Sequence, residues 1–396
     1  MSEQVIELSA ERFQAPASLG RIQAIALVVG ILGVASSAFF YTQDPKTFLT
    51  SYLVAWVFFL SISLGCLGLM MIQHLTQGDW GLTARRINEA SAGTLVLLAV
   101  GFVPIALGMK KLFKWLDPDL QAHDQFVQAK LWFLNEPGFL GRGVLYFVVW
   151  CGLAFFLRHY SKRQEETRDF QWIIRSRRVS GFGIVALAVT ATLASFDYLM
   201  SLDPHWYSSL YGVYFMGSCA VGGMTFMILI GTWLSQSDPM DKVLDADIFH
   251  AQGKLLLAFT MVWAYFTVSQ LIITWSGNLP EEVLWYQHRT GHGWGVIAIG
   301  GAFLHFFVPF LLLLSRPLKR RQGTLVWVAA LLLGAHWLDY FWQAIPNFRE
   351  HFSLALTDVT TVLGIGGLWL WFFLFLFSKR PIAPIHDPYL PEAIER

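Results

Sequence analysis

The sequence predicts an all-α, polytopic membrane protein: a bundle of about ten transmembrane helices with both termini in the cytoplasm. Three observations support this fold class. Hydrophobic residues make up 55% of the 396 residues and charged residues 14%, where a soluble domain carries roughly 25%. The mean hydropathy is +0.50. Apolar runs of about 20 residues, the length that crosses a bilayer, recur along the whole chain.

The ten runs divide the chain into one membrane domain and two tails. We expect a cytoplasmic tail at residues 1–20, the ten-helix domain at 21–378 and a second cytoplasmic tail at 379–396. The first twenty residues include Glu3, Glu7 and Glu11 and no basic n-region, so we interpret them as a tail rather than a cleaved signal peptide. The spans are expected near residues 21–41, 49–72, 92–109, 143–160, 179–200, 207–234, 254–275, 292–315, 323–345 and 357–378.

Basic residues orient the spans. Of the 28 Lys and Arg residues, 20 fall on the side of the two termini and 8 on the other side. The densest groups follow the fourth span, at Arg158–Arg178, and the eighth span, at Arg316–Arg321. The positive-inside rule therefore places these loops and both termini in the cytoplasm. The same alternation requires an even number of spans.

Three outer connections are informative. Residues 195–217 join the fifth and sixth spans through a few residues, which predicts that these two spans are antiparallel neighbours. Residues 110–142 contain KKLFKWLDPDL and AKLWFL, which indicate amphipathic helices at the membrane interface. Residues 277–291 predict a short helix after Pro280, because Glu281 and Glu282 favour its first turn.

Cysteines and glycines are interpreted as packing residues. Cys66, Cys151 and Cys219 lie in three different apolar runs, and their spacing fits no zinc, iron–sulfur or c-type haem motif. No basic stripe interleaved with aromatic residues indicates nucleic-acid binding. Glycines within the spans let helices approach closely, because lipid offers no hydrophobic drive for their association. They include Gly30, Gly33, Gly65, Gly222, Gly223, Gly364 and Gly367.

The sequence AHWLDYFWQAIP in the ninth span carries the clearest site signal. His336 and Asp339 are three residues apart and therefore share one helix face. Counting from Gly323 at 1.5 Å per residue puts His336 about 20 Å into the membrane. His305 in the eighth span is predicted at a similar depth. A charged side chain at the bilayer centre costs about 2.5–3.5 kcal/mol on insertion scales, so such residues usually have a function.

Seven residues are candidates for a proton pathway. Asp197, Asp339 and His336 are expected to line one hydrated cavity, with Asp203 and His205 near its outer mouth. Burial brings carboxylates and imidazoles towards a range in which they exchange protons. Each candidate also has a structural interpretation: a helix N-cap for Asp358, a hydrogen-bonded core residue for His305, the interface for Asp197 and a turn before Pro204 for Asp203. The candidates are Asp197, Asp203, His205, His305, His336, Asp339 and Asp358.

We expect this chain to bind no redox cofactor of its own. Only His305 and His336 are deep histidines, and a two-haem b-type cytochrome needs paired histidines on its spans. No cluster of His, Cys and carboxylate residues in the sequence has metal-ligand spacing.

Five blocks of the sequence carry a family resemblance. The blocks are FDYLMSLDPHWYSSLYGVYF, KLLLAFTMVWAYFTVSQLIITW, NLPEEVLWYQHR, FFVPFLLLLSRPLKR and HWLDYFWQAIP. In this combination they resemble the ActF-type subunits of bacterial alternative complex III. The likeness runs in the family order from about Phe48 to Phe377, and the two tails and residues 110–142 add little to it.

The resemblance implies a ten-helix subunit related to the NrfD/PsrC-type quinone proteins, in a bacterial inner membrane. Such a subunit belongs to a respiratory quinol:electron-acceptor oxidoreductase, contributes a proton pathway and a scaffold, and is not catalytic alone. The implied partners are an ActC-like paralogue with the quinol site, an iron–sulfur subunit, a multihaem cytochrome c subunit and membrane lipid. Haem c and iron–sulfur clusters are then expected in those partners. Quinone or menaquinone is expected in the complex, and its binding to this chain stays open. The matching blocks give the proton-pathway role to Asp197, Asp203, His205, His336 and Asp339.

Two other functions remain open. A stand-alone proton-coupled transporter would show broken helices at corresponding positions of two halves, and Pro104 and Pro309 lie inside spans without an evident symmetry. A quinone-binding membrane subunit of a related molybdopterin-type complex is the other alternative.

Overall fold

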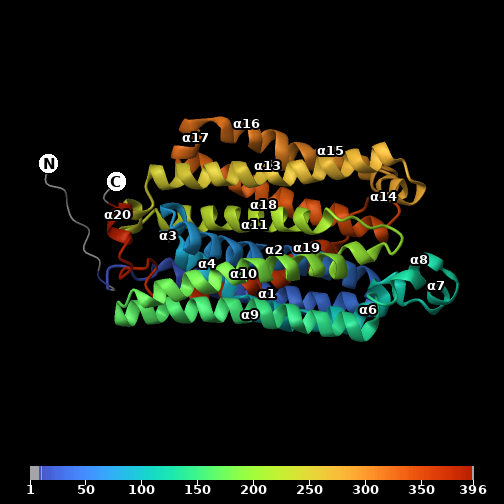
Figure 1. Cartoon of the computed structure of the whole chain (residues 1–396), viewed down its shortest axis with the longest axis horizontal. Helices are drawn as coiled ribbons and strands as arrows, with labels where there is room; N and C mark the ends of the chain where they lie inside the picture. Colours follow the sequence, from blue (N-terminus) through green and yellow to red (C-terminus); the bar gives the residue numbers. More distant parts are fainter. Residues whose placement is uncertain (1–8, 10, 395–396) are drawn as a thin grey trace.

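The computed structural model describes residue 9 and residues 11–394, and it shows a bundle of long helices lying side by side (Figure 1). Within these residues, nine helices are long and apolar enough to cross a membrane, and a tenth span is complete if one bent pair is counted as a single span. The all-α polytopic fold predicted from the sequence is confirmed. The straight spans are α1 (Ser18–Gln43), α2 (Pro45–Thr76), α9 (Glu136–Thr167), α10 (Gln171–Tyr198), α11 (Tyr211–Leu234), α13 (Ala246–Gly277), α18 (Gln322–Ala344) and α19 (Leu356–Phe377).

The third span is the bent one. It consists of α4 (Arg85–Gly93), α5 (Leu95–Gly101) and α6 (Val103–Leu112), with a bend of 53° before α6. Pro104 lies at the bend, where its ring and missing N–H disrupt the hydrogen bonding of a continuous helix. The span therefore begins at Arg85 and not near residue 92 as predicted, because its first turns carry charged residues that an apolar run excludes.

The eighth span is interrupted in a different way. It runs through α15 (Trp294–Ala302), the π-helical turn η3 (Phe303–Phe307) and α16 (Val308–Leu314). Pro309 cannot donate a backbone hydrogen bond to the carbonyl oxygen of His305 four residues earlier. Single π-helical turns of this kind are frequent at functional sites.

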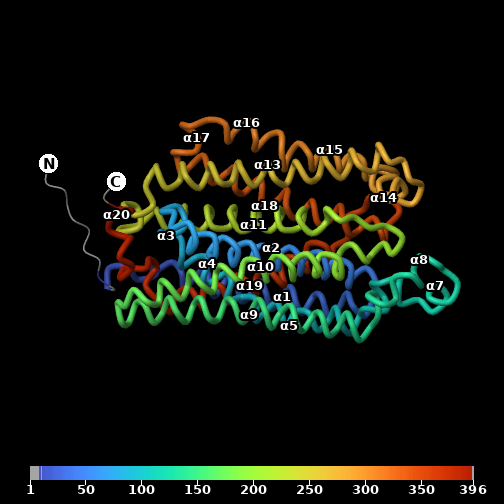
Figure 2. Tube along the Cα trace, viewed as in Figure 1, coloured from blue at the N-terminus to red at the C-terminus, as the bar shows by residue number. Residues whose placement is uncertain are grey.

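The spans form two groups of four helices and one flanking pair. The first group contains α2, the bent third span, α9 and α10, and the second contains α11, α13, the eighth span and α18. The tube view separates them into a lower and an upper layer (Figure 2). Helix α1 packs along α19, and this pair contacts α2. Helices α10 and α11 are in contact, as predicted from the short connection between them.

Short helices fill the connections at the two ends. Helix α14 (Pro280–Thr290) confirms the helix predicted after Pro280. Residues 110–142, where amphipathic helices were predicted, form several short helices, because Asp117 and Asp124 cap new helices at α7 and α8. The short elements are α3 (Asp79–Leu82), η1 (Lys114–Leu116), α7 (Pro118–His123), α8 (Gln125–Lys130), η2 (Met200–Leu202), α12 (Met240–Val243), α17 (Arg316–Arg320), η4 (Ile345–Asn347) and α20 (Leu390–Ile394).

The described ends of the chain lie at the same end of the bundle (Figure 1). The tail predicted at residues 379–396 packs there: Ile382 donates a backbone hydrogen bond to the carbonyl oxygen of Phe13 (2.9 Å), and both side chains are buried. Residues 1–8, 10, 395 and 396 of the two predicted tails, including Glu3 and Glu7, lie outside the described residues.

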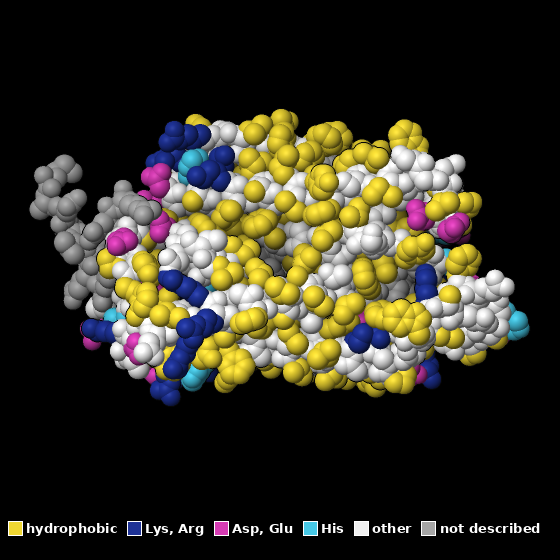
Figure 3. All heavy atoms as spheres, in the orientation of Figure 1, with side chains coloured by type: hydrophobic (Ala, Val, Ile, Leu, Met, Phe, Trp, Pro, Cys, Tyr) yellow, Lys and Arg dark blue, Asp and Glu magenta, His cyan; other side chains and the backbone are white. Residues whose placement is uncertain are grey.

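The outer surface of the bundle is apolar along its length. Hydrophobic side chains cover the long sides in Figure 3, and many Lys and Arg side chains gather near the end that holds the termini. Some large hydrophobic side chains of the bundle are almost fully exposed, such as Phe182 at 84% and Leu107 at 83%. This surface suits a lipid environment, in which exposed apolar residues need no further protein partner.

We predict that Ser276→Cys at the end of α13 is labelled by a membrane-impermeant maleimide added outside intact cells, and that Thr167→Cys at the end of α9 is not. Both residues are exposed and lie in the last turns of helices. The positive-inside rule supplies the expected side. The wild-type chain is the control for its own cysteines, of which Cys66 and Cys219 are buried. Labelling in the reverse pattern would reject the orientation.

Candidate functional site

Three of the seven predicted residues come together inside the second helix group. His305 lies on η3, and His336 and Asp339 lie on α18. The rings of His305 and His336 have centroids 6.1 Å apart, and His305 and Asp339 line the same small cavity of about 80 Å³. We call His305, His336 and Asp339 the central cluster.

Asp339 is surrounded by neutral hydrogen-bond donors. Its Oδ2 atom accepts a short hydrogen bond from the Tyr214 hydroxyl and a bond from Gln343 Nε2 (3.2 Å). Trp263 Nε1 (3.4 Å) and Ser218 Oγ (3.5 Å) approach the same oxygen. No Lys or Arg is among its hydrogen-bonding or ion-pair partners in the described structure. The carboxyl group is therefore solvated by the protein without a fixed counter-charge.

His336 is fully buried and is joined to the first helix group by one hydrogen bond. Its Nε2 atom lies 2.8 Å from Ser61 Oγ on α2. Ser61 Oγ also lies 2.7 Å from the carbonyl oxygen of Phe58 and can donate its proton there, which leaves Oγ able to accept a hydrogen bond from Nε2 of the imidazole. The other ring nitrogen, Nδ1, has no protein partner in the described structure.

Glycine provides the room for that imidazole. A Cβ atom at Gly222 of α11 would lie 2.7 Å from His336 Nε2, closer than van der Waals contact permits. His305 packs against the indole of Trp263, with ring centroids 3.9 Å apart. Both ring nitrogens of His305 lack a protein partner in the described residues. Buried polar atoms of this kind are rare and usually satisfied by water.

A second cavity connects Asp339 with the end of the bundle opposite the chain termini, which we call the outer end after the predicted orientation. It measures about 260 Å³ and lies between α11, α13, α14, the eighth span and α18, with Asp339 and Gln343 in its wall. Its lining is mainly aromatic and includes Trp206, Tyr211, Tyr214, Trp285, Tyr286 and Trp342.

Arg289 on α14 lies beside this cavity and was missed in the sequence. It is buried, and Nη2 donates to the backbone oxygen of Gln343 (2.7 Å) and to Asn347 Oδ1 (3.1 Å), while its guanidinium stacks on Trp285 (3.8 Å). Burial lowers the pKa of Arg289 to about 9, so the side chain remains charged at neutral pH. The block NLPEEVLWYQHR contained this residue, but its burial depends on how α14 folds back over the bundle.

The prediction that Asp197 shares a cavity with Asp339 is wrong. Asp197 forms a two-bond ion pair with Arg142 (2.7 and 2.9 Å) and accepts a hydrogen bond from Tyr146 (2.7 Å). Both partners lie on α9, in the first helix group. Asp197 is fully buried on the face of α10 that packs against α9. Its two-bond geometry is the strongest form of a carboxylate–guanidinium contact.

Asp203 and His205 lie in the outer connection, apart from the central cluster. His205 Nε2 is 2.6 Å from Asp124 Oδ2 on the other outer connection, and this hydrogen bond lowers the pKa of Asp124. Asp203 accepts from the backbone N–H of His205 (3.2 Å) and lines a separate cavity of about 380 Å³ with Lys130. These residues hold the two outer connections together.

Asp358 lies in the first turn of α19, where its carboxylate is paired with an arginine. Its carboxylate forms two bonds with Arg349 (2.7 and 3.0 Å) and accepts from Ser51 Oγ (2.5 Å) and from the N–H of Ala355 (2.8 Å). The last of these bonds caps the helix start, although from the third helical position and not from the N-cap itself. Asp358 is therefore not the N-cap predicted from the sequence, because Ala355 holds that position, but its carboxylate still stabilises the start of α19.

A buried ionic cluster at the other end of the bundle was also missed. Arg86 pairs with Glu89 (2.7 Å) and with Glu165 (2.7 Å), and Arg85 pairs with Asp387 of the C-terminal tail (2.7 Å). The spacing of Arg86 and Glu89 by three residues is a helical ion-pair pattern. It was overlooked because the third span was assigned from its apolar residues alone.

We predict that Arg142→Met destabilises the folded chain, by about 3–5 kcal/mol, because it leaves the buried Asp197 carboxylate without its cation. The measurement is thermal unfolding of the purified chain in detergent. The double variant Arg142→Met, Asp197→Asn should recover much of that loss, since it removes both charges. Equal unfolding of wild type and Arg142→Met would contradict the assignment.

Comparisons of the whole sequence with protein-family models and with curated proteins find no match. The functional interpretation therefore depends on the residue blocks and on the geometry of the central cluster.

Proposed function

We propose that this chain is the integral membrane subunit of a respiratory quinol:electron-acceptor oxidoreductase of the alternative complex III type, in a bacterial inner membrane. Within that complex we propose that it provides a scaffold and a route for protons. The central cluster is the observation that supports this role most strongly. It combines an Asp that has no cationic partner among the described residues with two imidazoles, of which three ring nitrogens have no protein partner there, all inside a membrane bundle.

The order of polar groups along the bundle supports a route. Helix α18 runs towards the outer end, so His336, Asp339 and Gln343 follow one another at intervals of about one helical turn. Gln343 accepts a hydrogen bond from Tyr211 (2.6 Å) and donates to the Tyr214 hydroxyl (2.6 Å). A proton on Asp339 would have its outward exit through the 260 Å³ cavity.

On the inner side, polar groups of the first helix group lie towards the buried ions of α4. Thr94 and Ser63 share a hydrogen bond (2.8 Å), and Trp369 Nε1 donates to Ser63 (2.9 Å). Ser61, two residues before Ser63 on α2, reaches His336; side chains two residues apart on a helix do not face each other, so water would have to join the two hydroxyls. The proposed route thus crosses between the two groups at the Ser61–His336 contact. Water would be needed to bridge the remaining steps, as is usual for buried polar atoms of this kind.

The quinone-binding alternative also has a specific observation in its favour. The 260 Å³ cavity has aromatic walls and a few polar residues, namely Thr267, Gln270, Thr290, Asp339 and Gln343. Ligand sites are typically apolar pockets with a few placed polar groups, at volumes of about 300–1,000 Å³. The cavity is slightly smaller than that range, so we place quinone binding second.

The transporter alternative receives less support. If the two groups of four helices are the repeating halves, the bent span is second in its group and the π-helical span is third. The interruptions then do not correspond, whereas transporter repeats place them at corresponding positions.

We predict that the chain purified in mild detergent retains iron–sulfur and multihaem cytochrome c partners. The isolated chain should show no reduced-minus-oxidised haem band. The free ring nitrogens of His305 are packed under Trp263, and His336 Nε2 is bonded to Ser61. Two results would contradict the proposal. One is a stoichiometric haem band in the separated chain, and the other is purification of the chain from native membranes without the iron–sulfur and cytochrome c partners.

We predict that Asp339→Asn lowers quinol-driven proton movement at least tenfold in reconstituted vesicles while the complex still assembles. Asparagine keeps the shape and accepts the same hydrogen bonds at Oδ1, but it cannot exchange a proton; general acid–base groups typically contribute 10²–10⁴-fold. The matched control is Asp119→Asn on the exposed part of α7. Unchanged proton movement with normal assembly would exclude Asp339 from the route, and loss of assembly alone would make the cluster structural.

A further inference from the structure

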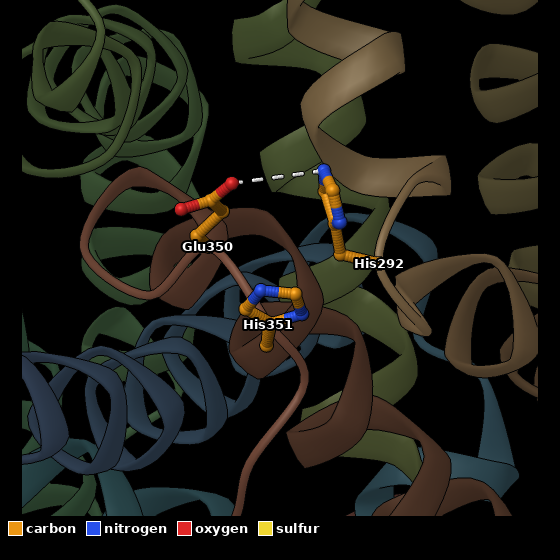
Figure 4. Close-up of side chains that lie close together, drawn as sticks. All are labelled: His292, Glu350 and His351. Carbon is orange, nitrogen blue, oxygen red and sulfur yellow. Dashed lines mark ion pairs between the residues drawn. The ribbon is translucent and has the colours of Figure 1, made fainter.

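Three side chains with metal-binding atoms gather at the outer end of the bundle, outside the central cluster. They are His292 from the turn between α14 and α15, and Glu350 and His351 from the connection between η4 and α19 (Figure 4). Their ligand atoms all lie within 4.8 Å of one another, and His292 Nε2 is 3.8 Å from Glu350 Oε1. The two imidazole rings have centroids 4.8 Å apart. No other group of three among the described residues meets the same condition.

The chemistry of this set suits a divalent transition metal. Two imidazoles and one carboxylate are a common protein ligand set for Zn²⁺, with bonds of about 2.0–2.2 Å and a fourth position for water. Tetrahedral geometry at that bond length separates ligand atoms by about 3.3 Å. The side chains would therefore have to close by at most about 1.5 Å. They are free to do so, because His292 and Glu350 are 54% and 75% exposed.

The backbone beneath these side chains is held in place. The N–H of Phe352 donates to the carbonyl oxygen of His292 (3.1 Å), and Trp294 Nε1 donates to the carbonyl oxygen of Glu350 (3.1 Å). His292 and Gly293 both have left-handed conformations, with φ of 48° and 88°. This pair of conformations makes a tight turn that glycine favours. Two connections far apart in sequence are thus fixed side by side before any ion binds.

The cationic side chain next to Glu350 in the sequence does not compete for its carboxylate. Arg349 precedes Glu350 but is engaged with Asp358 and with the carbonyl oxygen of Ser353 (3.0 Å). The ion-pair partner of Glu350 in the described structure is His292. A surface His–Glu pair alone would be unremarkable, but here a second imidazole lies within reach of both groups.

We propose that His292, Glu350 and His351 bind one divalent transition-metal ion of the Zn²⁺ type, with water in the remaining position. The ion joins the α14–α15 turn to the connection before α19. It therefore fixes the outer ends of the eighth and tenth spans relative to each other. This inference is independent of the proposed electron-transport role.

The test is titration of ZnCl₂ into the full chain, purified in detergent without a polyhistidine tag, by isothermal titration calorimetry. The wild type should bind one equivalent at this site and gain thermal stability with Zn²⁺, because a ligand that binds only the folded state stabilises it. His351→Ala, Glu350→Gln and His292→Asn should each weaken binding at least tenfold. Asparagine at position 292 tolerates the left-handed backbone.

The matched control is His288→Asn, which removes another exposed outer histidine from α14. It should bind Zn²⁺ as the wild type does. The proposal is overturned if the wild type takes up no stoichiometric Zn²⁺, if the three site variants keep wild-type affinity, or if His288→Asn loses binding equally. Circular dichroism of each variant establishes that it remains folded, and a variant that unfolds is replaced by the double variant Glu350→Gln, His351→Gln.

Discussion

The close approach of α2 and α11 is the contact on which the rest of the bundle depends. A Cβ atom at Gly65 of α2 would lie 1.8 Å from the carbonyl oxygen of Cys219, and one at Gly223 of α11 would lie 2.6 Å from the carbonyl carbon of Gly65. Only glycine permits two backbones to meet this closely. Because α2 belongs to the first helix group and α11 to the second, this contact fixes how the groups lie relative to each other. In lipid, where apolar burial drives no helix association, such tight packing is a main source of stability.

The same contact places the central cluster. Ser61 lies one turn before Gly65 on α2, and Gly222 precedes Gly223 on α11. Ser61 reaches His336 by a hydrogen bond, and Gly222 leaves room for the imidazole ring. An alanine at Gly65 or at Gly223 would push α2 and α11 apart and separate Ser61 from His336. The packing of the two groups and the position of the imidazole are therefore one structural feature.

The sequence was sufficient for the all-α polytopic fold, because span length and hydropathy are local properties. It also identified the His336–Asp339 pair from its helical spacing. It failed where a residue's role depends on a partner from another helix. Arg142 lies one residue before the predicted start of the fourth span and was treated as part of a loop, so its pairing with Asp197 was not expected. Arg85, Arg86 and Glu89 were missed because an apolar run cannot include them, although their charges are neutralised by one another and by the C-terminal tail.

Asp197, Asp339 and Asp358 looked alike in the sequence, and their partners distinguish them. Asp197 and Asp358 each face an arginine at 2.7 Å, and two charge-assisted hydrogen bonds hold each carboxylate in place. Removing either arginine would leave a buried charge, so these pairs serve structure. Asp339 faces a phenol, an indole, an amide and a hydroxyl. Such donors stabilise a carboxylate by hydrogen bonds without supplying a positive charge, so the charge on Asp339 is not locked by a neighbour. An acid that is to accept and release a proton during turnover needs this kind of environment, and Asp339 has it where the other two do not.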